Sequence, residues 1–257
     1  MAILHVHRSG PTDGAPLLAI HGITAHGRRF ERLSADYLFD RSIAAPDLRG
    51  HGESVREAPW NLETHVDDLI DTLDSIGWAT VDVVAHSLGG NLALRMLAAH
   101  PHRVRRLVLL DPVFLLPVET ATANAVHAMT DQSFRSLDEL IEARRDGRSE
   151  AAIPFSDADT RVAAYQGPDR RWRMNFERAA VVAMWGELAR ALPEPTETRP
   201  TLVINALQAQ LVQRRQIDWL ENALEDLLSQ VDLDLGHMLY WDDLVTTGRV
   251  IAGFLNE

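Results

Sequence analysis

The sequence predicts an α/β protein built on a doubly wound, mostly parallel sheet, with a helical cap inserted into it. Two observations lead to this prediction: short β-rich runs alternate with amphipathic stretches of helical period, and the alternation stops after Asp111 and resumes only at Pro200. Several runs are apolar throughout, which is typical of strands covered by helices on both faces. We therefore expect about seven strands, at residues 4–7, 17–20, 43–46, 81–85, 107–110, 201–205 and 231–235.

Amphipathic stretches between these strands predict the helices that cover the two faces of the sheet. They occupy residues 29–38, 65–76, 88–100, 217–227 and 244–254. The interruption carries three further helical patterns, near residues 122–129, 137–144 and 175–192. The expected domains are a core at residues 1–112 and 200–257, and a cap, or lid, at residues 113–199. Parallel sheets bind ligands at the carboxyl ends of their strands, so a cap belongs over that end.

The composition narrows the chemistry that the protein can use. The chain of 257 residues contains no cysteine and no lysine, so all 25 basic residues are arginine. This excludes thiol nucleophiles, cysteine-based metal sites and lysine amine chemistry, and it leaves hydroxyl, imidazole or carboxylate chemistry. A net charge of −12 disfavours nucleic-acid binding. Without a membrane-spanning run or a signal peptide, we expect a globular, cytoplasmic protein; its oligomeric state does not follow from the sequence.

The segment from Val83 to Gly90 has the pattern of a nucleophile elbow. A β-branched strand leads into Ser87, which has Ala85 two residues before it and Gly89 two residues after it, and a helical pattern follows at once. Small neighbours are needed because the strand and helix backbones pass close together at such a turn. An ordinary strand-to-helix turn, with Ser87 as the helix N-cap, is the alternative.

Two other segments lie where the same chemistry would require them. The sequence His21-Gly22-Ile23 directly follows a predicted strand, so the NH of Ile23, with the NH of Leu88, could form an oxyanion hole, while His21 is expected to be structural. Gly236 and His237 follow the last predicted strand, which places an imidazole on a loop suited to a general base.

With these motifs in place, the chain resembles the α/β-hydrolase superfamily, in particular its capped esterases, lipases and carbon-carbon-bond hydrolases. The resemblance rests on the His-Gly loop at 21, Asp-Leu-Arg-Gly-His-Gly-Glu-Ser at 47–54, the elbow at 85–90, Pro-Thr-Leu-Val-Ile at 200–204, and Gly-His at 236. It implies a serine nucleophile at Ser87, a base at His237 and no cofactor. A serine at the elbow argues against haloalkane dehalogenases and epoxide hydrolases. The family's sheet usually has eight strands, and this chain starts at what resembles the second.

The acid of the catalytic triad departs from the usual pattern. Most members of the family carry an aspartate shortly after the strand matched by residues 201–205, but Ala209 stands at that place, and no carboxylate occurs between Pro200 and Asp218. A minority carry the acid on the preceding strand, where this sequence has Asp111. An aspartate followed by Pro112 also ends a strand well, so a purely structural role is the alternative.

The expected activity is hydrolysis of a carboxylic ester of a small, largely apolar molecule through an acyl-enzyme. Carbon-carbon bond hydrolysis, and a degenerate hydrolase that only binds a small molecule, are the alternatives. Trp172, Phe114 and Trp185 are the candidate substrate-binding residues of the cap, and Arg170, Arg171 and Arg173 could meet a substrate carboxylate but more simply form a solvated face. His5 and His7 share a strand face without a convincing metal set, so no metal site is expected.

Overall fold

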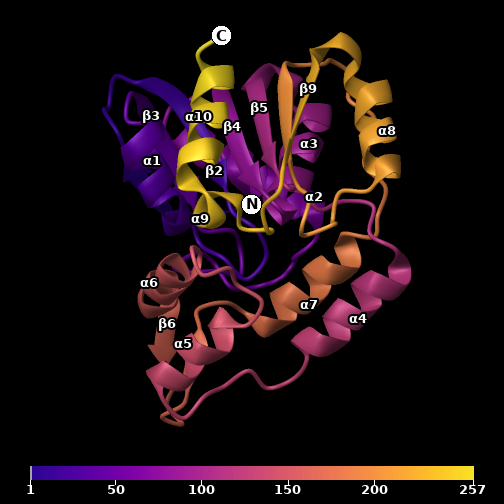
Figure 1. Cartoon of the computed structure of the whole chain (residues 1–257). Helices are drawn as coiled ribbons and strands as arrows, with labels where there is room; N and C mark the ends of the chain where they lie inside the picture. The colour runs from indigo at the N-terminus through magenta and orange to yellow at the C-terminus, as the bar shows by residue number, and fades with distance from the viewer. Residues whose placement is uncertain (1) are drawn as a thin grey trace.

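A computed structural model describes residues 2–257 and contains a seven-stranded sheet (Figure 1). The strand order is β1-β3-β2-β4-β5-β8-β9, and every neighbouring pair is parallel except β1 with β3. The doubly wound, mostly parallel sheet predicted from the sequence is thereby confirmed. The strands are β1 (Val6–Ser9), β2 (Ala15–Ile20), β3 (Arg41–Pro46), β4 (Val81–His86), β5 (Val104–Leu110), β8 (Thr201–Ala206) and β9 (Leu228–Leu233).

Helices cover both faces of the sheet, which explains the continuous apolar runs of its central strands. Successive residues of β2 alternate between two apolar clusters: Leu18 and Ile20 join one, and Leu17 and Ala19 join the other. The first cluster packs under α2 (Leu62–Ser75), α3 (Leu88–Ala99) and α8 (Arg214–Leu224). The second packs under α1 (Glu31–Tyr37), α9 (Leu239–Asp242) and α10 (Leu244–Leu255).

Residues between β5 and β8 form a separate group of helices at one end of the sheet (Figure 1). We call residues 113–199 the helical segment. Within it, α4 (Val118–Ala128) packs against α7 (Arg178–Glu187), and α5 (Leu137–Arg145) packs against α6 (Ile153–Ala163). A small hairpin, β6 (Ala164–Gln166) with β7 (Trp172–Met174), joins α6 to α7.

Three features of the helical segment and the sheet differ from the sequence-based expectation. The helix α6 and the hairpin β6–β7 were not expected, and β1 and β9 are shifted by two or three residues from the predicted strands. Pro154 lies in the first turn of α6, where its missing NH has no helical partner to lose.

The short 3-10 helices are η1 (Gly27–Phe30), η2 (Pro101–Arg103) and η3 (Glu225–Leu227).

Candidate active site

Ser87 occupies a sharp turn between β4 and α3, in a backbone conformation that side-chain-bearing residues rarely adopt. Its φ is 57° and its ψ is −119°. The turn is fixed from both sides, because the NH of Ser87 donates to the carbonyl of Leu110 at 3.0 Å and its carbonyl accepts from the NH of Gly90 at 3.0 Å. These bonds lock the serine at the junction of the two central strands and the helix.

The glycines after Ser87 let three backbones meet at this point. A Cβ added to Gly89 would lie 2.3 Å from the carbonyl oxygen of Ile20 at the end of β2, and one added to Gly90 would lie 2.6 Å from Cβ of Pro112. A close approach of strand and helix, as expected from the sequence, is therefore present at Gly89, while Gly90 packs against the side chain of Pro112. Ser87 itself is 4% exposed.

Asp111 and His237 are joined by a short hydrogen bond. Nδ1–H of His237 donates to Oδ2 of Asp111 at 2.6 Å, although 126 residues separate them in the sequence. Asp111 is fully buried, and its second oxygen accepts from the backbone NH of Ala206 at 3.3 Å. Ala209, where the sequence pattern led us to look for the usual acid, lies in the turn after β8 and packs against the second apolar cluster.

His86 supports the loop that carries His237, and the sequence reasoning missed it. Its Nε2–H donates to the carbonyl of His237 at 2.8 Å, and the two rings are 4.5 Å apart. Burial, reinforced by the nearby His237, keeps the pKa of His86 well below its usual value, so the ring is neutral. A neutral ring with its proton on Nε2 can hold the His237 carbonyl in place.

The loop after β2 approaches the Ser87 side chain directly. A Cβ added to Gly22 would lie 2.8 Å from Cβ and 3.3 Å from Oγ of Ser87. Within residues 2–257, the backbone NH groups of Ile23 and Leu88 donate to no other group, and Leu88 is the first residue of α3, whose leading NH groups have no helical partner. Both donors therefore remain available beside Ser87.

Two buried imidazoles hold this loop in place. His21 donates through Nδ1 to the carbonyl of Gly22 at 2.7 Å and accepts the NH of Leu48 at Nε2 at 2.9 Å, so it is structural, as expected. His51 accepts the NH of Thr24 at 3.2 Å. Burial lowers the pKa of His51 to about 4, which leaves its ring able to accept. The sequence reasoning gave residues 47–54 no chemistry, and their supporting role depends on contacts that only the fold creates.

Asp47 forms hydrogen bonds with several segments of the same region, and His5 and His7 lie near it. One potential ligand atom from each of these three residues lies within 4.8 Å of the others. Oδ1 of Asp47 accepts from the NH of Gly27 at 2.8 Å and lies 3.1 Å from Nε2 of His7, and Oδ2 accepts from the NH of Glu53 at 3.0 Å. Burial raises the pKa of Asp47, but the hydrogen bonds outweigh it and hold the pKa well below its usual range. These contacts account for Asp47 as a structural anchor.

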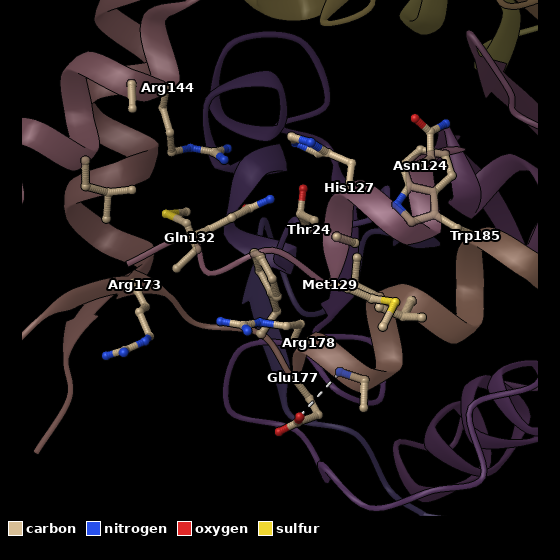
Figure 2. Close-up of a pocket in the computed structure, with 18 of the residues that line it drawn as sticks. Thr24, Asn124, His127, Met129, Gln132, Arg144, Arg173, Glu177, Arg178 and Trp185 are labelled. Atoms are coloured by element: carbon tan, nitrogen blue, oxygen red, sulfur yellow. Dashed lines mark hydrogen bonds between the residues drawn. The ribbon is translucent and has the colours of Figure 1, made fainter. Parts of the chain in front are cut away.

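A cavity of about 1210 Å³ lies within the helical segment and reaches the loop after β2 at Thr24 (Figure 2). Of the three aromatic residues expected to bind substrate, Trp185 lines this cavity. Trp172 belongs to β7 and exchanges backbone hydrogen bonds with Phe134. Phe114 is 1% exposed and packs edge-to-face on Trp219, so the core accounts for it. Neither Trp172 nor Phe114 is part of the cavity wall.

Comparison with known proteins gives a consistent picture. A protein family described as having the alpha/beta hydrolase fold matches residues 15–244. The chain is 36% identical over 246 residues to lipase LipV of Mycobacterium tuberculosis, covering 92% of this chain and 91% of the lipase. It is 27% identical to 2-hydroxymuconate semialdehyde hydrolase of a Pseudomonas species, covering 98% of this chain and 90% of that enzyme.

Solved structures share the fold at lower sequence identity. The structure of E-2-(acetamidomethylene)succinate hydrolase superimposes with a TM-score of 0.86 at 24% identity, covering 99% of this chain and 95% of that one. A marine microorganism esterase gives a TM-score of 0.83 at 18% identity, covering 99% of this chain and 100% of the other. In residues 2–257, none of the helices has the length and apolar character needed to cross a bilayer.

Proposed function

We propose that this chain, which belongs to the α/β-hydrolase family, is a serine hydrolase that cleaves a carboxylic ester of a small molecule through an acyl-enzyme. The observation that supports this most strongly is the 2.6 Å bond between Asp111 and His237. Ser87, in the strained elbow conformation, directly follows His86, whose ring lies 4.5 Å from that of His237. The identity to a lipase over nine-tenths of the chain supports the same class of reaction.

In the proposed mechanism, His237 takes the proton of the Ser87 hydroxyl, and the serine oxygen attacks the ester carbonyl. Asp111 keeps the His237 proton on Nδ1 and stabilises the imidazolium that forms. The NH groups of Ile23 and Leu88 donate to the oxyanion, and loss of one such donor typically costs ~100- to 1,000-fold in rate. His237 then protonates the leaving alcohol. In the second step His237 takes a proton from water, the water oxygen attacks the acyl carbon, and the proton passes to the Ser87 oxygen as the acid is released.

The helical segment is proposed to act as a cap over this site, and residues 1–112 and 200–257 as the catalytic core. Ser87 is 4% exposed, so the substrate must reach it through a cover of protein. Thr24, which lines the cavity, is the residue after Ile23. This supports entry of the substrate from the cavity. Trp185 would then contribute an apolar surface to substrate binding.

The test combines turnover with covalent labelling. Wild-type protein should hydrolyse 4-nitrophenyl butanoate and should be labelled by a fluorophosphonate at Ser87, as located by mass spectrometry. Ser87→Ala should lose at least about 1,000-fold in kcat and all labelling. Ser42→Ala, at a serine on β3 that is as buried as Ser87, is the matched control and should retain both. Undiminished turnover by Ser87→Ala would rule out the proposal.

Carbon-carbon bond hydrolysis is the second candidate, favoured by the 27% identity to a semialdehyde hydrolase over nearly the whole chain. Such a reaction would use the same Ser87 and His237 on a vinylogous ketone. A dienol ring-cleavage product assayed beside simple esters separates the two. A binding protein with a dismantled triad is disfavoured by the Asp111–His237 bond, and it would resist the fluorophosphonate.

A further inference from the structure

Beside the cavity, three arginines, Arg29, Arg144 and Arg148, gather around the buried carboxylate of Asp159. Asp159 on α6 has a side chain that is 4% exposed. Arg29 donates to both of its oxygens, each at 2.9 Å, and Nε2 of His26 lies 2.8 Å from Oδ1. Although burial raises the pKa of Asp159, Arg29 and His26 hold it well below its usual range. The Asp159 carboxylate is therefore charged and already well coordinated.

Arg144 and Arg148 lie next to this pair, and neither donates a hydrogen bond to a carboxylate. Nη2 of Arg144 is 3.8 Å from Asp159, beyond hydrogen-bond distance. The Arg148 guanidinium lies over the Trp241 ring at 5.5 Å, and that ring also carries Arg29 at 5.1 Å. In the part of the chain that the structure describes, residues 2–257, neither guanidinium makes a hydrogen bond, and both Nε atoms are buried without a partner.

The other arginines of the cavity wall differ in this respect. Arg173 donates to Asp169 at 2.6 Å and Arg178 donates to Asp131 at 3.1 Å. Arg56 donates to the side-chain oxygen of Asn175 and to the carbonyl of Gly52. Among the arginines of the cavity wall, Arg144 and Arg148 are therefore the two whose guanidinium NH groups donate no hydrogen bond to the described residues.

Burying unpaired cations is unfavourable, and an incoming anion offsets that cost. Burial is the main cause that lowers the pKa of Arg144 to about 10, and it also lowers the pKa of Arg148, with Arg29 adding to both effects. Both groups nevertheless remain charged at neutral pH. A guanidinium presents a planar fork of donors that matches a carboxylate. A carboxylate between the two arginines would supply the acceptors that they lack.

The two arginines line the same cavity that reaches the loop after β2. Both line it, as does Thr24, and Figure 2 shows the Arg144 guanidinium pointing into the cavity toward Thr24 and His127. The turn after Arg148 touches the segment that follows the base, because the Ser149 hydroxyl hydrogen-bonds to Asp242. The cavity that holds the arginines therefore extends to Thr24, the residue after the proposed oxyanion donor Ile23.

We propose that Arg144 and Arg148 form a carboxylate subsite, and that the substrates of this hydrolase are esters that carry a free carboxylate. The proposal rests on ester hydrolysis at Ser87 and specifies its substrate class. The sequence favours a solvated face for Arg170, Arg171 and Arg173 over a carboxylate contact, and the proposal assigns the substrate carboxylate to Arg144 and Arg148.

The experiment compares esters that differ only in one carboxylate. Phenyl hexanoate is paired with the phenyl half-ester of adipic acid, and phenyl butanoate with 3-butanoyloxybenzoate, so that the acyl and alcohol sides are both covered. The readout is the ratio of kcat/KM within each pair. Wild type should prefer the carboxylate member of at least one pair by about 10- to 100-fold, the range of a charge-assisted bond.

Arg144→Gln and Arg148→Gln should each reduce this preference about tenfold or more, and Arg148→Lys should retain part of it. Arg145→Gln is the matched control on the same helix, because Arg145 is paired with Asp157 and Glu142 and does not line the cavity. Its preference should equal that of wild type. A wild-type ratio near one in both pairs, or a preference that survives in the double glutamine variant, would overturn the subsite while leaving ester hydrolysis intact.

Calorimetric titration with adipate and with inorganic phosphate tests the subsite without turnover. Adipate should bind Ser87→Ala and should not bind Ser87→Ala combined with Arg148→Gln, even if every ester proves inert and the proposed reaction fails. Binding of phosphate alone, or binding of adipate that is unaffected by Arg148→Gln, would refute a carboxylate subsite. Circular dichroism of each variant establishes that it is folded.

Discussion

Asp111 is the residue on which the choice between an enzyme and a binding protein depends. It directly follows β5, the strand that pairs with β4 before Ser87, and its NH donates to the carbonyl of Ile204 at 2.8 Å. Its φ is positive, at 41°, so Asp111 does not continue the extended backbone of β5. Held by Ala206 and His237, the carboxylate has a fixed orientation, which an acid needs in order to select one imidazole tautomer.

Asp111→Asn should reduce kcat by roughly 1,000- to 10,000-fold on 4-nitrophenyl butanoate, because an amide favours the wrong tautomer of His237. Steady-state kinetics with a thermal melt of the same sample measure the effect. Asp232→Asn is a matched control, because Asp232 bonds only to amides, at Asn205 and Gln230, and should retain its rate. A loss of only a few-fold in folded Asp111→Asn would show that Asp111 is not the acid.

At the level of elements, the site depends on how closely the loop after β2 approaches the turn between β4 and α3. The glycines at 22, 89 and 90 are each within contact range of a neighbouring backbone or side chain. These glycines therefore leave room for the loop after β2, the turn after β4 and the start of α3 to pack closely. Gly253 on α10 differs, because a Cβ added there would meet nothing within 4 Å.

Gly22→Ala should reduce kcat by about 100-fold or more, because the new methyl would press on Ser87 and shift the oxyanion donors. Overpacking should also lower the free energy of unfolding by about 1–3 kcal/mol. Gly253→Ala is the control, expected to keep its rate and to gain about 0.5–1 kcal/mol from better helix propensity. Kinetics and urea denaturation measure both. If Gly22→Ala retains full activity, the loop is not packed against Ser87 as described.

At the level of the whole molecule, several buried histidines are neutral in the folded state. Burial is the main cause that lowers the pKa of His51 to about 4 and that of His65 to about 3, and it keeps the pKa of His21 and His86 well below the usual value. Unfolded histidines bind protons near pH 6.5, so the unfolded state takes up more protons below that pH. Stability should therefore be full above about pH 7 and should fall as the pH drops toward 4.

His65 offers the clearest test, because both of its ring nitrogens are buried without a partner among residues 2–257. Between pH 7 and pH 5 it should account for about 2 kcal/mol of lost unfolding free energy. His65→Leu should remove that share of the pH dependence, whatever its effect at pH 7. Urea denaturation at both pH values measures the difference. An unchanged slope in His65→Leu would show that His65 does not contribute, and His100→Leu, at a partly exposed histidine, serves as the control.

The sequence was sufficient for the sheet and its helices because central strands covered on both faces must be apolar throughout, and amphipathic helices must follow them. It was insufficient for α6, whose Asp159 bonds to Arg29 from 130 residues away, and for the hairpin β6–β7, whose strands are only three residues long. Ser87, Asp111 and His237 could be selected from motifs and strand order. The support from His86 could not, because its partner lies 151 residues further on.

The turn after β8 carries none of the residues that the proposed mechanism uses. Leu207 there is 50% exposed, while the NH groups of Leu207 and Gln208 donate to the carbonyls of Leu233 and Leu235. Where the acid occupies such a turn, its length and shape are constrained by the need to meet the base. In this protein that constraint falls on β5, inside the sheet. Within this turn Gln210 is exposed and belongs to neither apolar cluster, so an affinity tag or a fluorescent reporter inserted at that residue should leave the reacting groups in place.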